Sequence, residues 1–104
     1  KYVSPSELIL WSIRGILDEM LRDRENIFDS LRRLYTMYGQ GLYFLDTLAV
    51  GFGLECQELH DKGYGRDSSR GRAFVRRFEN KIQREVDRML SWLDRGTITI
   101  LDEY

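Results

Sequence analysis

Apolar residues recur at helical spacing over the first third of the chain. They form two stripes, at Ile9, Leu10, Ile13, Ile16, Leu17 and Met20 and again at Ile27, Phe28, Leu31, Leu34, Tyr35 and Tyr38. The second stripe repeats the first after 18 residues, or five full turns, so the two are in phase. Ser4, Pro5 and Glu7 form a capping sequence before them. The pattern predicts one long helix over about residues 5–38, with a kink or short loop near Asp23 as the alternative.

A second segment is apolar on nearly every side. Gly39 and Gly41 indicate a tight turn, and residues 42–50, which follow, are hydrophobic almost throughout. A helix of this composition is buried on several sides. We therefore expect a middle helix over about 41–61 that lies between the other two. Small residues that would let a neighbouring backbone approach it closely are Ala49, Gly51 and Gly53.

The last third of the chain carries the clearest amphipathic pattern. Its apolar face consists of Val75, Phe78, Ile82, Val86, Met89 and Leu93. Ser68 or Ser69 can cap the start, so the pattern predicts a helix over about 69–95. Residues 97–101 alternate like a strand but have no partner strand in the chain, so we expect an extended tail that lies on the helices or pairs between protomers.

These elements predict an all-α fold in one domain of 104 residues, 1–104. The expected architecture is an elongated antiparallel arrangement of three helices with a short extended C-terminal tail. The helices are placed at about 5–38, 41–61 and 69–95. Three helices, one of them apolar all round, have more apolar surface than a thin monomer easily covers. We therefore expect a homodimer or a larger assembly with a protein partner.

The composition limits the compartment in which the protein is expected. Hydrophobic residues make up 42% of the chain, which is enough for a core. The single cysteine, Cys56, cannot form an intramolecular disulfide, and a secreted domain of this size usually needs several. We expect a reducing, cytoplasmic location. We also expect no membrane span, because Asp46 interrupts the longest apolar run, 42–52, which is shorter than the ~20 residues required.

Charge is divided unevenly along the chain. Residues 1–61 carry 6 basic and 10 acidic residues, whereas residues 62–95 carry 10 basic and 5 acidic residues. On the last predicted helix the bases fall in a narrow sector that holds no acid and has Phe74 and Trp92 at its edge. They are Arg70, Arg77, Lys81, Arg84 and Arg88, and the preceding loop adds Arg66 and Arg72. Such a face suits nucleic acid or an acidic protein surface, and the alternative is ion pairing inside the fold.

Trp11 interrupts the amphipathic pattern of the first helix. It projects almost opposite the apolar stripe, alongside Leu8 and Gly15, where a polar face is expected. Because exposed tryptophans are common anchors of protein interfaces, we predict that these three residues contact a protein partner. The alternative is that the chain itself covers Trp11, with residues 2–3 or 98–101.

Few residues in the chain suit catalysis or metal binding. Cys56 and His60 lie one helical turn apart, but no second Cys or His exists to complete a site. The Gly-x-Gly pairs do not complete a phosphate-binding loop. We therefore expect no catalytic residue, cofactor or metal, and no enzyme. The leading hypothesis is a helical protein-interaction module, an adaptor or regulatory domain that self-associates, and the alternative is a nucleic-acid-binding protein that uses the basic face.

Overall fold

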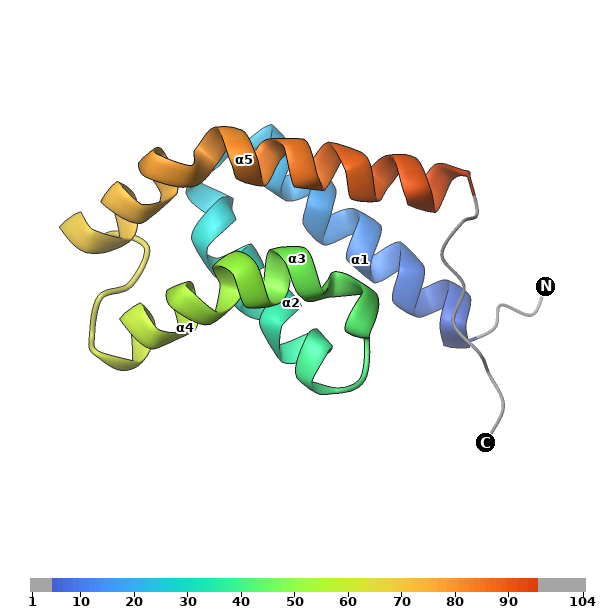
Figure 1. Ribbon diagram of the computed structural model, residues 1–104, viewed down its shortest axis with the longest axis horizontal. Coiled ribbons are helices and arrows are strands. Elements are labelled where there is room, and N and C mark those ends of the chain that lie inside the picture. Colours follow the sequence, from blue (N-terminus) through green and yellow to red (C-terminus); the bar gives the residue numbers. More distant parts are fainter. Residues whose placement is uncertain (1–4, 96–104) are drawn as a thin grey trace.

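A computed structural model describes residues 5–95, and every regular element in this range is helical (Figure 1). The α-helices are α1 (Pro5–Arg22), α2 (Ile27–Gly39), α3 (Asp46–Leu48), α4 (Leu54–Asp61) and α5 (Ser69–Asp94). Two 3-10 turns, η1 (Arg24–Asn26) and η2 (Tyr43–Leu45), precede α2 and α3, and a π-helical turn, η3 (Ala49–Gly53), joins α3 to α4. The all-α class is thus confirmed, and the tail predicted at 97–101 lies outside the described residues.

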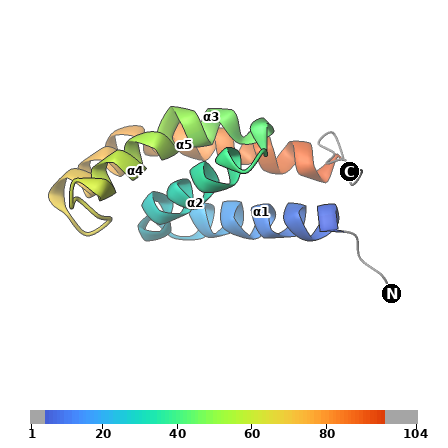
Figure 2. The same ribbon diagram turned by 90° about the horizontal axis from the view of Figure 1, so that it is seen from below.

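The segment predicted as one helix over 5–38 consists of two helices. The chain leaves α1 at Asp23, whose backbone is extended and whose carboxylate accepts a hydrogen bond from the Glu25 N–H at 3.0 Å. Aspartate favours such capping positions, so it ends one helix and starts the next. The prediction of a single helix is therefore wrong, and the alternative, a break near Asp23, is confirmed. The break lets α2 turn back along α1 (Figure 2), so the two apolar stripes share one core instead of extending into solvent.

The middle of the chain is one continuous helical segment from η2 to the end of α4, close to the predicted 41–61. It packs on α2 at Gly53, where an added Cβ would lie 2.5 Å from the Leu31 carbonyl oxygen. The close approach predicted for small residues is therefore confirmed at Gly53, whereas Gly51 faces open space. The prediction that this segment lies enclosed holds only for its inner side, because Tyr43 and Val50 are exposed.

Helix α5 runs antiparallel to α1 and covers one side of the core (Figures 1 and 2). Ser68 caps its start, since the Ser68 Oγ accepts a hydrogen bond from the Gly71 N–H at 3.0 Å. Ile82 and Val86 of the predicted stripe are fully buried. The helix spans Ser69–Asp94, in close agreement with the predicted 69–95.

The helices form an elongated body of 45 × 25 × 23 Å. Helix α2 contacts α1 on one side and η3 and α4 on the other, so the predicted three-helix antiparallel arrangement is corrected by one additional packed helix. This arrangement leaves a long face where α5 lies beside the middle segment (Figure 1). Within residues 5–95, no helix is long and apolar enough to cross a bilayer.

Candidate functional site

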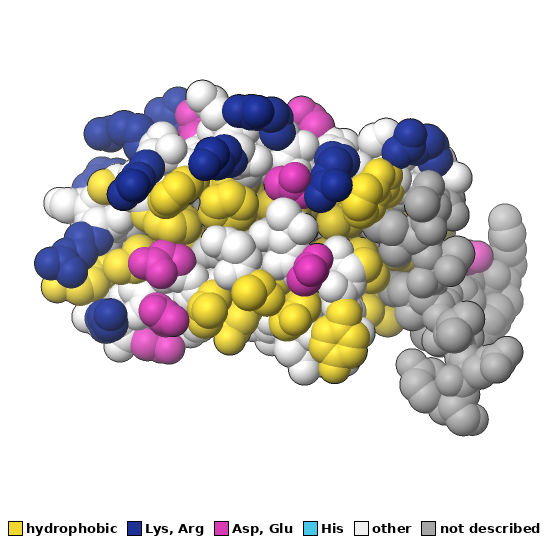
Figure 3. Space-filling view, viewed as in Figure 1, with side chains coloured by type: hydrophobic (Ala, Val, Ile, Leu, Met, Phe, Trp, Pro, Cys, Tyr) yellow, Lys and Arg dark blue, Asp and Glu magenta, His cyan; other side chains and the backbone are white. Residues whose placement is uncertain are grey.

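A groove lies between α5 and the segment formed by η3 and α4 (Figure 3). Its main hollow has a volume of about 490 Å³ and is bounded on the α5 side by Arg70, Ala73, Phe74, Arg77 and Phe78. The opposite wall is formed by Gly51, Phe52, Glu55 and Leu59. A second hollow of about 270 Å³ continues toward Lys81 and Arg84. Phe52 borders both hollows, so together they form one furrow, which we call the α5 groove.

The floor of the α5 groove is aromatic. The ring centroids of Phe52 and Phe78 are 5.8 Å apart, and those of Phe74 and Phe78 are 5.1 Å apart, both in tilted geometry. All three side chains are half-buried. The π-helical turn η3 carries an extra residue per turn relative to an α-helix. It places Phe52 at the groove while Gly53 faces α2.

A row of bases forms the α5 side of the groove (Figure 3). Within residues 5–95, four of these exposed side chains have no ion pair with an acidic residue: Arg70, Arg77, Lys81 and Arg84. Their guanidinium groups lie over aromatic rings in two cases, Arg70 over Tyr64 at 4.5 Å and Arg77 over Phe78 at 5.2 Å. The bases on this rim therefore present uncompensated positive charge beside an apolar floor.

Arg88, the fifth base predicted on this sector, is neutralised. Its Nη2 lies 2.6 Å from a carboxylate oxygen of Glu85, and its guanidinium stacks over Trp92 at 4.5 Å. Ion pairing inside the fold, the alternative for the whole basic sector, therefore applies to Arg88 and not to the four bases of the groove rim within the described part of the chain.

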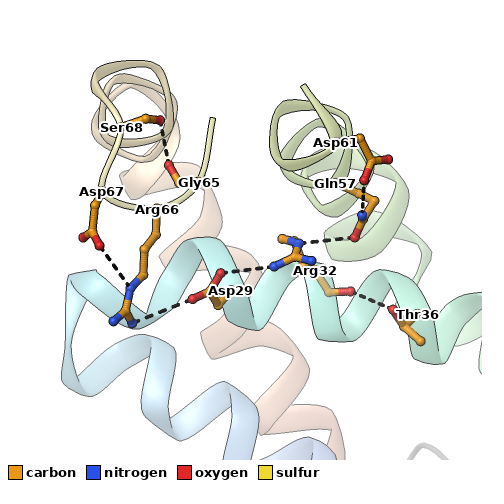
Figure 4. Close-up of polar contacts among 9 residues, drawn as sticks. All are labelled: Asp29, Arg32, Thr36, Gln57, Asp61, Gly65, Arg66, Asp67 and Ser68. Carbon is orange, nitrogen blue, oxygen red and sulfur yellow. Dashed lines mark hydrogen bonds and ion pairs between the residues drawn. The ribbon is translucent and has the colours of Figure 1, made fainter. Parts of the chain in front are cut away.

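Arg66 and Arg72 lie apart from the α5 groove (Figure 4). The Arg66 guanidinium is 3.7 Å from an Asp29 carboxylate oxygen and 3.9 Å from one of Asp67. Arg72 donates a hydrogen bond to the Asp67 carbonyl at 2.7 Å. Both arginines border a separate hollow of about 210 Å³ near Phe28. The seven predicted bases therefore do not form one surface.

The exposed residues predicted on the first helix lie on the outer face of α1. The side chains of Leu8 and Trp11 are 51% and 58% exposed, and Gly15 is exposed beside them with no atom within 4 Å of an added Cβ. We call these three residues the Trp11 patch. A hollow of about 140 Å³ separates Trp11 from Leu93 at the end of α5. Residues 2–3 and 98–101, the alternative cover for Trp11, lie outside the described residues.

Cys56 and His60 lie on α4 but have different environments. Cys56 is fully buried, and burial raises the pKa of its thiol from 9.0 to about 12, with a further contribution from the Glu55 carboxylate. His60 is exposed. Within residues 5–95, no group of three or more His, Cys, Asp or Glu side chains is arranged to hold a metal ion. A neutral, buried thiol is a poor nucleophile, so this pair does not form a reactive site.

The wall opposite α5 is the part of the groove that the sequence pattern does not reveal. The pattern places Phe74 at the edge of the basic sector, but it indicates no role beyond helix packing for Gly51, Phe52 and Glu55. The signal in the sequence is weak: a single Phe between two glycines in an apolar run. Its contact with Phe78, 26 residues further along, depends on how two helices pack and not on local periodicity.

Comparison with known proteins identifies no relative. No protein-family model matches the chain, and neither a curated protein nor a solved structure matches it. The function is therefore inferred from the α5 groove and the Trp11 patch alone.

Proposed function

We propose that the protein is a helical interaction module, an adaptor or regulatory domain that acts by binding a protein partner in the α5 groove. The observation that carries this proposal is the juxtaposition of uncompensated bases with an apolar floor, as where Arg77 lies beside Phe78 and Phe74. Covering the floor supplies hydrophobic free energy, and the bases orient an acidic partner and speed its association. Aromatic residues and arginine are also the residue types enriched at the centres of protein interfaces.

A protein partner fits the α5 groove better than a nucleic acid does. The bases lie on one wall only, and Glu55 on the opposite wall would repel phosphate groups. Nucleic acid binding to aromatic residues needs ring faces on which bases can stack. Here Phe74 and Phe78 are half-buried and packed against each other. Nucleic-acid binding by the basic face of α5 is the alternative, and crosslinking combined with nuclease treatment distinguishes the two.

Self-association through the Trp11 patch is a second part of the proposal. It is supported by the exposure of Trp11 and Leu8 on one face of α1. In a two-fold dimer the same patch meets itself, so one exposed tryptophan provides two interface anchors. Arg14, beside the patch, is held by Asp94 at 2.6 Å and so contributes little free charge to oppose this contact.

A reducing, cytoplasmic location is the compartment we propose for this module. Cys56 is a free, buried thiol. A domain that used disulfides for stability would need at least two cysteines, and this chain has one. The stability of the described part comes instead from the apolar core shared by α1, α2, the middle segment and α5.

Site-specific photo-crosslinking tests the function even though the partner is unidentified. Benzoylphenylalanine is placed at Ala73, an exposed residue of α5 that borders the groove, in the full chain expressed in its native cells. We expect light-dependent adducts with a protein that survive nuclease treatment. The matched control is Thr36, an exposed residue of α2 that does not border the groove, where we expect no adduct.

Two outcomes would contradict the proposal. Adducts at Ala73 that nuclease removes would establish nucleic acid as the occupant of the groove. Equal adducts at Ala73 and Thr36 would show that the protein has no specific binding surface in the α5 groove. A third probe at Ser12, an exposed residue next to Trp11, reports separately on the Trp11 patch.

A further inference from the structure

The dimensions of the α5 groove point to an elongated occupant. The bases on its rim extend from Arg70 to Arg84, 14 residues of one helix, which corresponds to about 21 Å at ~1.5 Å per residue. The two hollows, of about 490 and 270 Å³, follow one another along this length. The site is therefore a furrow about as long as four turns of helix, and not a closed pocket for a small molecule.

The walls of the groove favour a helical occupant over an extended one. Both walls are helices, whose backbone N–H and C=O groups are already paired, and no strand edge exists within residues 5–95. An extended peptide laid in this furrow would find side chains but no backbone partner for its own N–H and C=O groups. A helix pairs those groups internally, so it can bury an apolar face here without that cost.

The charges of the groove define which face of the helix is acidic. The α5 wall carries the four uncompensated bases, whereas the opposite wall carries Glu55. Glu85 also borders the second hollow, but Arg88 holds it at 2.6 Å. An occupant with acids on both flanks would bring like charges against Glu55. The complementary helix therefore has acids on one flank only, beside its apolar stripe.

We infer that the α5 groove binds an acidic amphipathic α-helix of another protein. About four turns of this helix place an apolar stripe on Phe52, Phe74 and Phe78, and a row of carboxylates along one flank pairs with Arg77, Lys81 and Arg84. This inference rests on the proposed function and adds the chemistry of the partner. Apolar contacts supply most of the affinity, and the charges decide which amphipathic helices bind.

Synthetic peptides of about 18 residues test the inference directly with the full chain. The first has a leucine stripe with glutamates on one flank. The second contains the same residues permuted so that no apolar face forms, and the third keeps the stripe but replaces each glutamate with lysine. We expect the first peptide to bind at least tenfold more tightly than either control. Its affinity should weaken severalfold between about 50 mM and about 300 mM salt, because its ion pairs are screened.

Two glycine variants provide a matched pair that separates the two candidate surfaces. Gly51 borders the α5 groove and Gly15 belongs to the Trp11 patch, both are helical, and neither has an atom within 4 Å of an added Cβ. Gly51→Leu fills the groove and should weaken binding of the first peptide at least tenfold. Gly15→Leu should leave the affinity unchanged. Far-ultraviolet circular dichroism of both variants checks that the fold is retained.

Charge reversal tests the role of the rim. The double variant Arg77→Glu, Arg84→Glu alters two exposed residues and leaves the aromatic floor in place. It should bind the glutamate peptide at least tenfold less tightly and the lysine peptide more tightly than the unaltered protein does. Loss of affinity for both peptides, with an intact fold, would contradict the proposed role of the charges.

The remaining outcomes separate this inference from the proposed function. Equal binding of the amphipathic and permuted peptides, or no effect of Gly51→Leu, overturns the inference. If no peptide binds but Ala73 still gives nuclease-resistant protein adducts, the inference fails and the proposed function stands. Nuclease-sensitive adducts overturn both. Displacement of the bound peptide by excess unlabelled protein would show that a second copy of this chain occupies the groove, which also overturns the inference.

Discussion

Gly53 of η3 lies directly against the backbone of α2 at Leu31. A Cβ added to Gly53 would be 2.5 Å from the Leu31 carbonyl oxygen and 3.0 Å from the Tyr35 Cβ. Real Cβ atoms do not approach a carbonyl oxygen this closely, so the position accepts only glycine while the two helices keep their separation. This contact sets how close the middle segment lies to α2 and therefore which side of η3 faces α5.

Gly53→Ala should destabilise the protein by about 2 kcal/mol or more, because the methyl group must push η3 away from α2. The matched variant Gly51→Ala lies in the same π-helical turn but has no atom within 4 Å of its added Cβ. It should stabilise the protein by up to ~1 kcal/mol, since alanine has the higher helix propensity. Urea unfolding followed by circular dichroism measures both. Similar effects of the two variants would contradict the close packing of Gly53.

Ile82→Asp should destabilise the protein by several kcal/mol. Ile82 is fully buried in the core, and a carboxylate there would have no partner and no water. The exposed neighbour Arg84 provides the control, because Arg84→Ala should change the unfolding free energy by less than ~0.5 kcal/mol. An unfolding midpoint for Ile82→Asp equal to that of the unaltered protein would show that this stripe does not face the interior.

Asp23→Ala should cost about 1 kcal/mol of stability, because it removes the carboxylate that accepts the Glu25 N–H at the start of η1. Asp23→Asn is the matched control, since the asparagine side chain also caps helix starts and should retain most of the stability. Thermal unfolding of the three proteins measures the difference. If alanine and asparagine were equivalent, the carboxylate hydrogen bond would not maintain the break between α1 and α2.

The buried thiol of Cys56 should make stability fall at alkaline pH. Its pKa is raised from 9.0 to about 12 in the folded protein, so the unfolded chain ionises first. The contribution of the neutral thiol is therefore complete below about pH 9 and is lost between about pH 9 and 12, at up to about 1.4 kcal/mol per pH unit. Unfolding by urea at several pH values from 8 upward measures this slope. The variant Cys56→Ala isolates it from the titration of other groups, and an identical slope in that variant would contradict the prediction.

Trp11→Ala should weaken self-association by about 2 kcal/mol or more while the helical content stays the same. The side chain is exposed on α1, so its removal leaves the described core intact. Sedimentation equilibrium over a range of concentrations measures the dissociation constant. A monomer at high micromolar concentration in the unaltered protein would contradict self-association, and an unchanged constant in the variant would contradict the role of Trp11.

Local sequence signals predicted the elements whose boundaries depend on neighbouring residues. Ser68 caps α5 by accepting a hydrogen bond from Gly71 three residues away, and the apolar spacing of Ile82 and Val86 correctly placed both in the core. Asp23 was harder, because stripes that are in phase across 18 residues are compatible with one straight helix or with two that fold together. The free energy that decides between them comes from burying one stripe against the other, which is a long-range effect.

Helical periodicity alone was enough to predict the all-α class, the last helix, the exposed position of Trp11 and the sector that holds Arg70, Arg77, Lys81 and Arg84, because it sorts residues onto faces. Which of these faces meet depends on tertiary packing. That packing paired Arg88 with Glu85, separated Arg66 and Arg72 from the other bases, and brought Phe52 to Phe78 across 26 residues. No local pattern specifies these contacts, because the α5 groove lies between segments distant in the chain and its shape depends on close approaches such as Gly53 on Leu31.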